Sequence, residues 1–138
     1  MRLLTAATAA LVAVALGGLA DTALAQPKVP PGYKAAPIEV AQLPPYCYAQ
    51  YVDGAYFGHP VYSIPAACGP YTNHFCPALV SLIRGSNASR ARSLRREDLR
   101  HAAMEVRYTL RYMKPDCPIY NDVQVAKIRA ESLQKIVQ

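Results

Sequence analysis

The four cysteines of this chain are the residues whose chemistry the sequence indicates most directly. They follow an apolar N-terminal segment typical of a secretory leader, and exported proteins normally carry oxidised thiols. Four cysteines allow three pairings, and spacing alone does not choose among them. If the helix that begins near Cys76 and the helix that ends before Cys117 are antiparallel, the bridges lie at one end of the protein. We favour Cys47–Cys76 with Cys68–Cys117, and keep Cys47–Cys117 with Cys68–Cys76 as second choice.

Histidine and methionine residues add the possibility of metal binding. Cys68, His74 and Cys76 are close in sequence but lack the Cys-x-x-Cys spacing of structural zinc sites. His101 and Met104 are three residues apart on a predicted helix and could bind soft copper. Disulfide formation and core packing explain these residues without a metal. We predict no metal and no cofactor, and keep as an alternative a small accessory subunit that handles a metal or redox centre through His74, His101 and Met104.

The hydroxyl and carboxyl groups follow no recognised catalytic pattern. Ser81, Ser86, Ser89 and Ser93 have no nucleophile-elbow context, and no pair of acidic residues is spaced for acid–base catalysis. A Cys-x-x-Cys-His motif for covalent haem does not occur in the sequence. We predict that the protein is not an enzyme.

Arginines form the strongest charge feature of the chain. Four of them recur at offsets of 4, 7 and 4, which places them as a ridge along one helix: Arg96, Arg100, Arg107 and Arg111. Such a ridge could bind a carboxylate, a phosphate or an acidic polysaccharide. A solvated helix face, balanced by neighbouring acidic residues, explains the same pattern.

Tyrosines crowd residues 46–76, a stretch that glycine and proline break too often for long elements. We expect loops there, with one short helix near residues 48–53. Tyr48, Tyr51 and Tyr56 are the predicted partner-contacting residues of these loops. In the alternative interpretation the tyrosines cap a small core, with each ring buried and each hydroxyl in water.

Composition divides the chain into three parts. Residues 1–25 read as a signal peptide that ends in Ala23-Leu24-Ala25, with an uncleaved anchor as the alternative. Residues 26–45 are rich in proline and predict an extended arm. Residues 46–138 predict one disulfide-stapled domain. Apart from the leader, no stretch of the chain is long and apolar enough to span a membrane. The predicted location is therefore periplasmic or secreted.

Hydrophobic spacing predicts three helices in the second half. The first should begin with Thr72 or Asn73 as its N-cap and end at Gly85. The second should begin between residues 93 and 97 and stop before Pro115, and the third should be capped by Asn121 or Asp122. The apolar stripes expected on the last two helices are Leu99, Ala103, Val106, Leu110 and Met113, and Val123, Ala126, Ala130, Leu133 and Val137. The fold class is mainly α: a three-helix domain, a helical hairpin plus a C-terminal helix, with a loop-rich, disulfide-tied N-terminal segment.

The chain is basic, with a net charge of +6 and a pI near 9.3. Outside the cytoplasm a basic surface meets acidic proteins and anionic envelope polymers, so nucleic acid is the least expected partner. Solubility alone is the competing explanation for the charge.

Residues 43–118 resemble small exported disulfide-containing proteins with tetratricopeptide-like helical hairpins. The resemblance is carried by Leu43-Pro44-Pro45-Tyr46-Cys47, by Asn73-His74-Phe75-Cys76-Pro77-Ala78-Leu79, and by Leu99 to Tyr108 after the arginine-bearing turn. Such proteins usually have several helix pairs, whereas this chain has room for about one and a half. The resemblance implies a protein-binding or scaffold role and a bridge between Cys47 and Cys76.

Together these features predict a secreted or periplasmic, non-enzymatic binding or scaffold module for a protein or an anionic envelope polymer. Besides the metal or redox subunit, the other alternative is an inhibitor of a wall-degrading hydrolase. The sequence does not set the oligomeric state.

Overall fold

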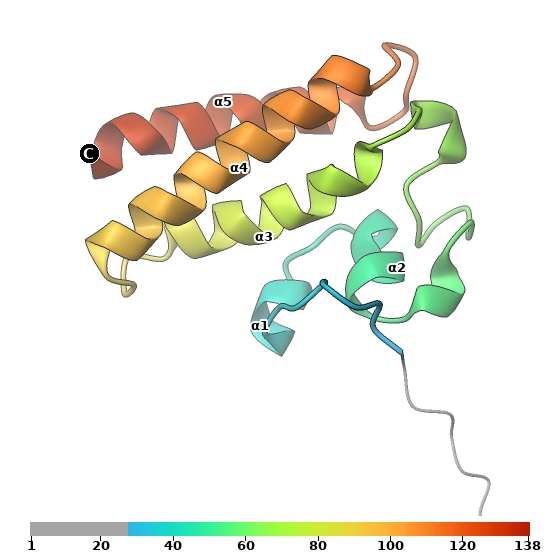
Figure 1. The fold of residues 1–138 in the computed structure, drawn as a ribbon, viewed down its shortest axis with the longest axis horizontal. Helices are drawn as coiled ribbons and strands as arrows, with labels where there is room; N and C mark the ends of the chain where they lie inside the picture. Colours follow the sequence, from blue (N-terminus) through green and yellow to red (C-terminus); the bar gives the residue numbers. More distant parts are fainter. Residues whose placement is uncertain (1–27) are drawn as a thin grey trace, which may run out of the picture.

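Three long helices form the body of the protein. The computed structural model describes residues 28–138, so the predicted signal peptide lies outside the described residues. Helices α3 (Phe75–Ser86), α4 (Arg92–Tyr112) and α5 (Tyr120–Val137) run antiparallel to their chain neighbours, and α4 packs against both others (Figure 1). The described residues contain no β-strand. The predicted mainly α class, with three main helices and a disulfide-tied N-terminal segment, is confirmed.

The apolar stripe predicted for α4 faces the core. Leu99, Ala103, Val106 and Met113 are buried, and Leu110 is half-buried against the same cluster. Two residues outside that stripe, Ala102 and Thr109, are also buried. Because α4 packs against α3 and α5 together, its buried face is wider than a single stripe.

The stripe predicted for α5 is confirmed as well. Val123, Ala126, Ala130 and Val137 are buried, and Leu133 is half-buried against the core. The start of the helix differs from the prediction: α5 begins at Tyr120 with Ile119 at its N-cap, so neither Asn121 nor Asp122 caps it. Asp122 instead lies in the first turn, where the positive end of the helix dipole stabilises a carboxylate.

The ends of α3 and the start of α4 also differ from the prediction. Thr72 and Asn73 do not cap α3; with His74 they form a short 3₁₀ helix, η4 (Thr72–His74), that leads directly into it. Helix α4 begins at Arg92, one residue before the predicted window, and stops before Pro115 as expected. Such 3₁₀ turns are common at helix ends because they bond backbone groups that the α-helix leaves unpaired.

Gly85 does not end α3, as the sequence suggested, but lies inside it. A Cβ atom at this position would lie 2.5 Å from Cγ and 2.7 Å from Cδ2 of Leu99 on α4. The glycine is therefore required by the close approach of the two helices, and its helix continues to Ser86.

The proline-rich arm folds back onto the domain. The extended conformation predicted for residues 26–45 is wrong for its last part, because Pro37–Val40 form a short helix, α1, with proline at a first-turn position. Leu43 is then buried in a small core cluster with Cys47, Tyr51, Cys76 and Val80. Residues from Pro37 onward thus belong to the folded domain.

Short elements connect this arm to α3. They are η1 (Pro45–Cys47), α2 (Tyr48–Tyr51), η2 (Gly54–Tyr56) and η3 (Ala66–Cys68). The short helix expected near residues 48–53 is confirmed as α2. Of these elements, α2 lies beside α3 on the other side from α4 and α5, whereas η3 lies at the end of the bundle near the connection between α4 and α5 (Figure 1).

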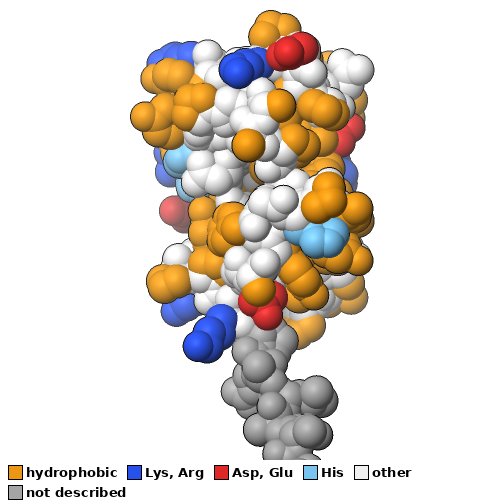
Figure 2. All heavy atoms as spheres, turned by 90° about the vertical axis from the view of Figure 1, so that its right-hand side faces the viewer, with side chains coloured by type: hydrophobic (Ala, Val, Ile, Leu, Met, Phe, Trp, Pro, Cys, Tyr) orange, Lys and Arg blue, Asp and Glu red, His pale blue; other side chains and the backbone are white. Residues whose placement is uncertain are grey.

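Two disulfides tie this region to the helices. They join Cys47 to Cys76 and Cys68 to Cys117, the pairing that we favoured from the sequence. Cys76 is the second residue of α3 and Cys117 follows α4, and the start of α3 and the end of α4 lie at the same end of the bundle (Figure 1). Hydrophobic and uncharged side chains cover most of this end of the molecule, with the few charges near its edges (Figure 2).

An ion pair fastens α1 to α3. Both oxygens of the Glu39 carboxylate accept hydrogen bonds of 2.8 Å from the Arg84 guanidinium, and one of them also accepts from the backbone N–H of Ala36 at 2.7 Å. The Arg84 guanidinium holds the pKa of Glu39 below its ordinary value of 4.5. The pair therefore stabilises the folded arm wherever the carboxylate is ionised.

We expect Glu39→Gln to lower the free energy of unfolding at pH 7 by about 1.5 to 3 kcal/mol, the usual size of a hydrogen bond to a charged group. A carboxyl group whose pKa falls on folding stabilises the protein above its unfolded pKa, and this contribution is lost as the pH falls through the folded value. The difference between Glu39→Gln and the unaltered protein should therefore shrink below pH 4.5. Urea unfolding at several pH values measures it, with exposed Glu97→Gln as the control. A difference that grows in acid would contradict the prediction.

No helix within residues 28–138 is long and apolar enough to cross a bilayer.

Candidate functional site

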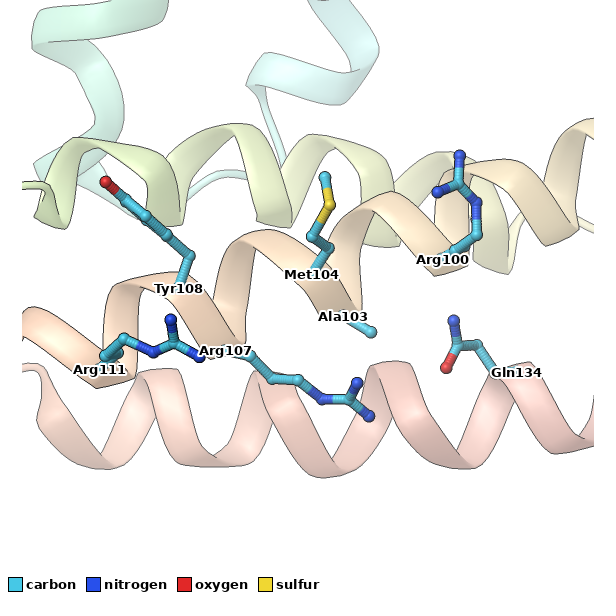
Figure 3. A pocket seen from close by; sticks show the side chains of 7 residues that line it. All are labelled: Arg100, Ala103, Met104, Arg107, Tyr108, Arg111 and Gln134. Atoms are coloured by element: carbon cyan, nitrogen blue, oxygen red, sulfur yellow. The ribbon is translucent and has the colours of Figure 1, made fainter.

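An open groove runs along the surface where α4 meets α5. Its volume is about 460 Å³, and its lining combines cationic, apolar and amide side chains: Arg100, Ala103, Met104, Arg107, Tyr108, Arg111 and Gln134. All but Gln134 come from α4, and Gln134 projects toward them from α5 (Figure 3). We call this the arginine groove. Three of the four arginines predicted to contact a partner therefore share one depression.

The three arginines of the groove differ in their partners. Arg107 reaches over α5 (Figure 3). Its Nη2 and Nε atoms donate hydrogen bonds of 2.9 and 3.0 Å to the Glu131 carboxylate oxygen Oε1. Hydrogen bonds from Arg107 and Lys127 lower the pKa of Glu131. Arg100 and Arg111 make no ion pair within the described part of the chain. The groove thus offers two cations that a ligand could pair with.

The fourth predicted arginine lies apart from the groove. Arg96 is exposed on α4 but is not among the lining residues. The regular ridge inferred from the sequence is therefore split, because Arg96 precedes the section of α4 that faces Gln134.

The tyrosines predicted to contact a partner do not lie in this groove. Tyr51 is only 7% exposed and packs edge-on against Tyr33, so little of its side chain is open to a partner; burial raises its pKa to about 12. Tyr48 and Tyr56 are half-buried, and each packs against the ring of Tyr62. These three rings pack on one another within the loop-rich segment.

A different set of tyrosines borders the groove. Tyr71, Tyr108 and Tyr112 form a cluster with ring centroids 4.9 to 5.8 Å apart, which we call the tyrosine cluster. Tyr71 is 50% exposed and Tyr112 is 41% exposed. Tyr108 also lines the arginine groove, so the two surfaces are continuous.

Tyr71 has an unusual backbone. With φ of 64° and ψ of 7°, it is in the left-handed region, and it is the one described non-glycine residue with a positive φ. This conformation is uncommon for a bulky side chain and is found where the surrounding structure imposes it. Here the backbone N–H of Lys114 donates to the carbonyl of Cys68 at 3.0 Å, and the Thr72 hydroxyl donates to the carbonyl of Gly69 at 3.1 Å.

Two histidines meet at one carboxylate next to the cluster. Glu105 Oε2 lies 2.5 Å from His74 Nδ1, and Oε1 lies 3.5 Å from His101 Nε2. The other ring nitrogen of His101 is 3.0 Å from Ser81 Oγ. The His74 ring packs 4.7 Å from Tyr108 and supports one side of the tyrosine cluster.

The serine, histidine and glutamate of this network have the residue types of a catalytic triad. Ser81, however, is buried within α3, where the neighbouring backbone amides bond to their own helix and cannot stabilise an oxyanion. The network joins α3 to α4 through the contact of Ser81 with His101. The spacing of His101 and Glu105, four residues apart on one helix, is the only part of it that a sequence pattern could have indicated.

The residues named for metal binding are divided between two places. His74 and His101 meet at Glu105, whereas Met104 lines the arginine groove. Cys68 and Cys76 are both in disulfides. Across residues 28–138, no group of three or more histidine, cysteine, aspartate or glutamate side chains is arranged to hold a metal ion.

No protein-family model, curated protein or solved structure matches this chain. The resemblance to exported proteins with tetratricopeptide-like hairpins stays a prediction.

Proposed function

We propose that this protein is an exported, non-enzymatic binding module that holds an anionic partner of the cell envelope, a protein or a polymer, in its arginine groove. The observation that supports it is that Arg100 and Arg111, neither of them in an ion pair among the described residues, both line one open depression together with Met104 and Tyr108. Arginine binds carboxylate and phosphate through a planar fork of donors, which gives geometry as well as charge.

Several features support export. The described residues contain two disulfides, and such bridges persist in oxidising compartments. Residues 1–25 have the composition of a signal peptide. The basic charge of +6 suits an envelope rich in anionic polymers.

The test uses the oxidised chain from residue 26 and two polyanions, polyglutamate and polygalacturonate. We expect binding of at least one of them to weaken by about tenfold or more when Arg100→Glu and Arg111→Glu are combined, since like charges then face the ligand. Affinity should also fall as salt is added.

The matched control reverses two exposed lysines that lie outside the groove, Lys28 and Lys34, to glutamate. This control changes the net charge by the same amount. If it weakens binding as much as the groove variant does, the attraction is a property of total charge and the proposed site is wrong. Failure of the unaltered protein to bind either polymer would contradict the proposal that the arginine groove binds an anionic partner.

A further inference from the structure

We infer that the arginine groove and the tyrosine cluster are two parts of one site, and that its ligand is a linear acidic polysaccharide. The inference rests on the proposed function and specifies the ligand of the same site. Sugar rings would lie on the tyrosine cluster, and their carboxylates would pair with Arg111 and Arg100.

The two parts are joined along one face of α4. Arg100, Met104, Tyr108 and Tyr112 follow each other at intervals of four residues, which places them on neighbouring turns. At 1.5 Å per residue this row is about 18 Å long. Tyr108 belongs to both parts, since it lines the groove and its ring lies 4.9 Å from that of Tyr112. The site therefore has the elongated form that suits a chain molecule.

Tyr71 supplies the second, independent observation. Its left-handed backbone would suit glycine or asparagine better than an aromatic residue. The ring is nevertheless half-exposed, so burial in the core does not explain it. It lies 5.8 Å from Tyr108 and 5.1 Å from Tyr112, and thus extends the row of α4 with a ring from a different segment. An exposed aromatic ring held in an unfavourable conformation indicates a binding role.

The segment that carries Tyr71 is well fixed. Cys68, three residues before it, is bridged to Cys117, and the Lys114 N–H bonds to the Cys68 carbonyl. Gly69, with φ of 99°, allows this segment to pass close to the end of α4, since a Cβ atom there would lie 3.1 Å from the carbonyl oxygen of Tyr112. A preorganised platform of this kind loses little conformational entropy when a ligand binds.

The composition of the site favours a saccharide over other polyanions. The faces of sugar rings that carry C–H groups pack against aromatic rings, and tyrosine hydroxyls can bond to sugar hydroxyls. Uronic acid carboxylates match the fork of arginine donors. Polyglutamate or a polyphosphate would use the arginines but has no ring face of C–H groups to pack on the tyrosine cluster.

The decisive experiment compares polygalacturonate with polyglutamate on the oxidised chain from residue 26. The key variant is Tyr71→Gly, which removes the ring and relieves the backbone, so that the fold should keep its thermal stability or gain some. We expect Tyr71→Gly to weaken polygalacturonate binding by about fivefold to tenfold, the usual size of one aromatic contact, and to leave polyglutamate binding unchanged. Phe57→Ala, which removes an exposed aromatic ring outside the cluster and the groove, should change neither.

Each outcome has a separate meaning. If Tyr71→Gly is folded and binds polygalacturonate as well as the unaltered protein does, the saccharide inference is wrong. The proposed anion site then still stands as long as Arg100→Glu combined with Arg111→Glu weakens binding. If Tyr71→Gly weakens both polymers equally, the cluster contacts acidic polymers in general and the assignment to saccharides is also wrong. If the arginine reversals change nothing, the proposed function fails together with the inference.

Discussion

Replacing Cys68 and Cys117 together by alanine should lower the free energy of unfolding by about 4 kcal/mol, the chain-entropy value for a loop of this length. The bridge closes 49 residues, and the two cysteines are buried in the main core cluster. Without it, the unfolded chain gains conformational freedom that the folded state does not share. Near this domain size, such a loss corresponds to a fall in Tm of roughly 20 °C.

Urea and thermal unfolding of the oxidised proteins measure this effect. The matched control is Cys47→Ala with Cys76→Ala, which opens a shorter loop of 29 residues and should cost roughly 0.5 kcal/mol less. The Cys68 variant should also lose more polygalacturonate affinity than the control, since Cys68 fixes the segment that carries Tyr71. Unchanged stability on loss of either bridge would show that the disulfides do not form in the native protein.

Leu99→Ala is the second substitution with a large expected effect, a loss of about 3 to 5 kcal/mol. Leu99 is fully buried, and its side chain occupies the space that Gly85 leaves between α3 and α4. Truncation removes apolar contacts and leaves a cavity between two helices. Gly85→Ala should also destabilise the protein, by about 1 to 3 kcal/mol, because the new methyl group overlaps Leu99.

The double variant distinguishes this contact from two unrelated defects. With Leu99→Ala in place, both Leu99 atoms nearest the new methyl group are gone, and alanine at position 85 gains helix propensity of about 1 kcal/mol over glycine. We therefore expect the double variant to be more stable than the sum of the single losses, by about 0.5 to 3 kcal/mol. Urea unfolding of all four proteins completes the cycle. Simple additivity would mean that the Leu99 side chain does not cause the loss in Gly85→Ala, and would point to the carbonyl oxygen of Arg95, 3.2 Å from the new Cβ atom.

The helices could be predicted because their apolar residues repeat with the period of the α-helix. The repeat placed Val106 and Val123 in the core without knowledge of the partners. Gly85 was misread because a glycine at a helix end and a glycine at a helix contact look alike in sequence. Only the position of Leu99, fourteen residues later, distinguishes the two roles. Pro37 was misread in the same way, because proline suits both an extended arm and the first turn of a helix.

The candidate site was predicted in part. The spacing of Arg100, Arg107 and Arg111 placed them on one helix, but the groove also needs α5, whose Gln134 and Glu131 meet them only through tertiary packing. Tyr71 was not singled out, because a positive φ on a tyrosine leaves no trace in composition or periodicity. The burial of Tyr51 likewise depends on Tyr33, which lies in an arm that was expected to be extended.

Both disulfides lie at one end of the bundle, so the free energy of local unfolding should differ between the two ends. At the opposite end, the turn between α3 and α4 and the C-terminal residues are held by noncovalent contacts alone, such as the bonds from Arg92 to the carbonyls of Val137 and Gln138. Fraying should begin there, and amide hydrogen exchange should slow progressively from that end toward Cys68 and Cys76. A polymer bound beside Tyr71 and Tyr112 would thus be held at the slowly exchanging end. Local opening at the other end of the bundle would not disturb its site.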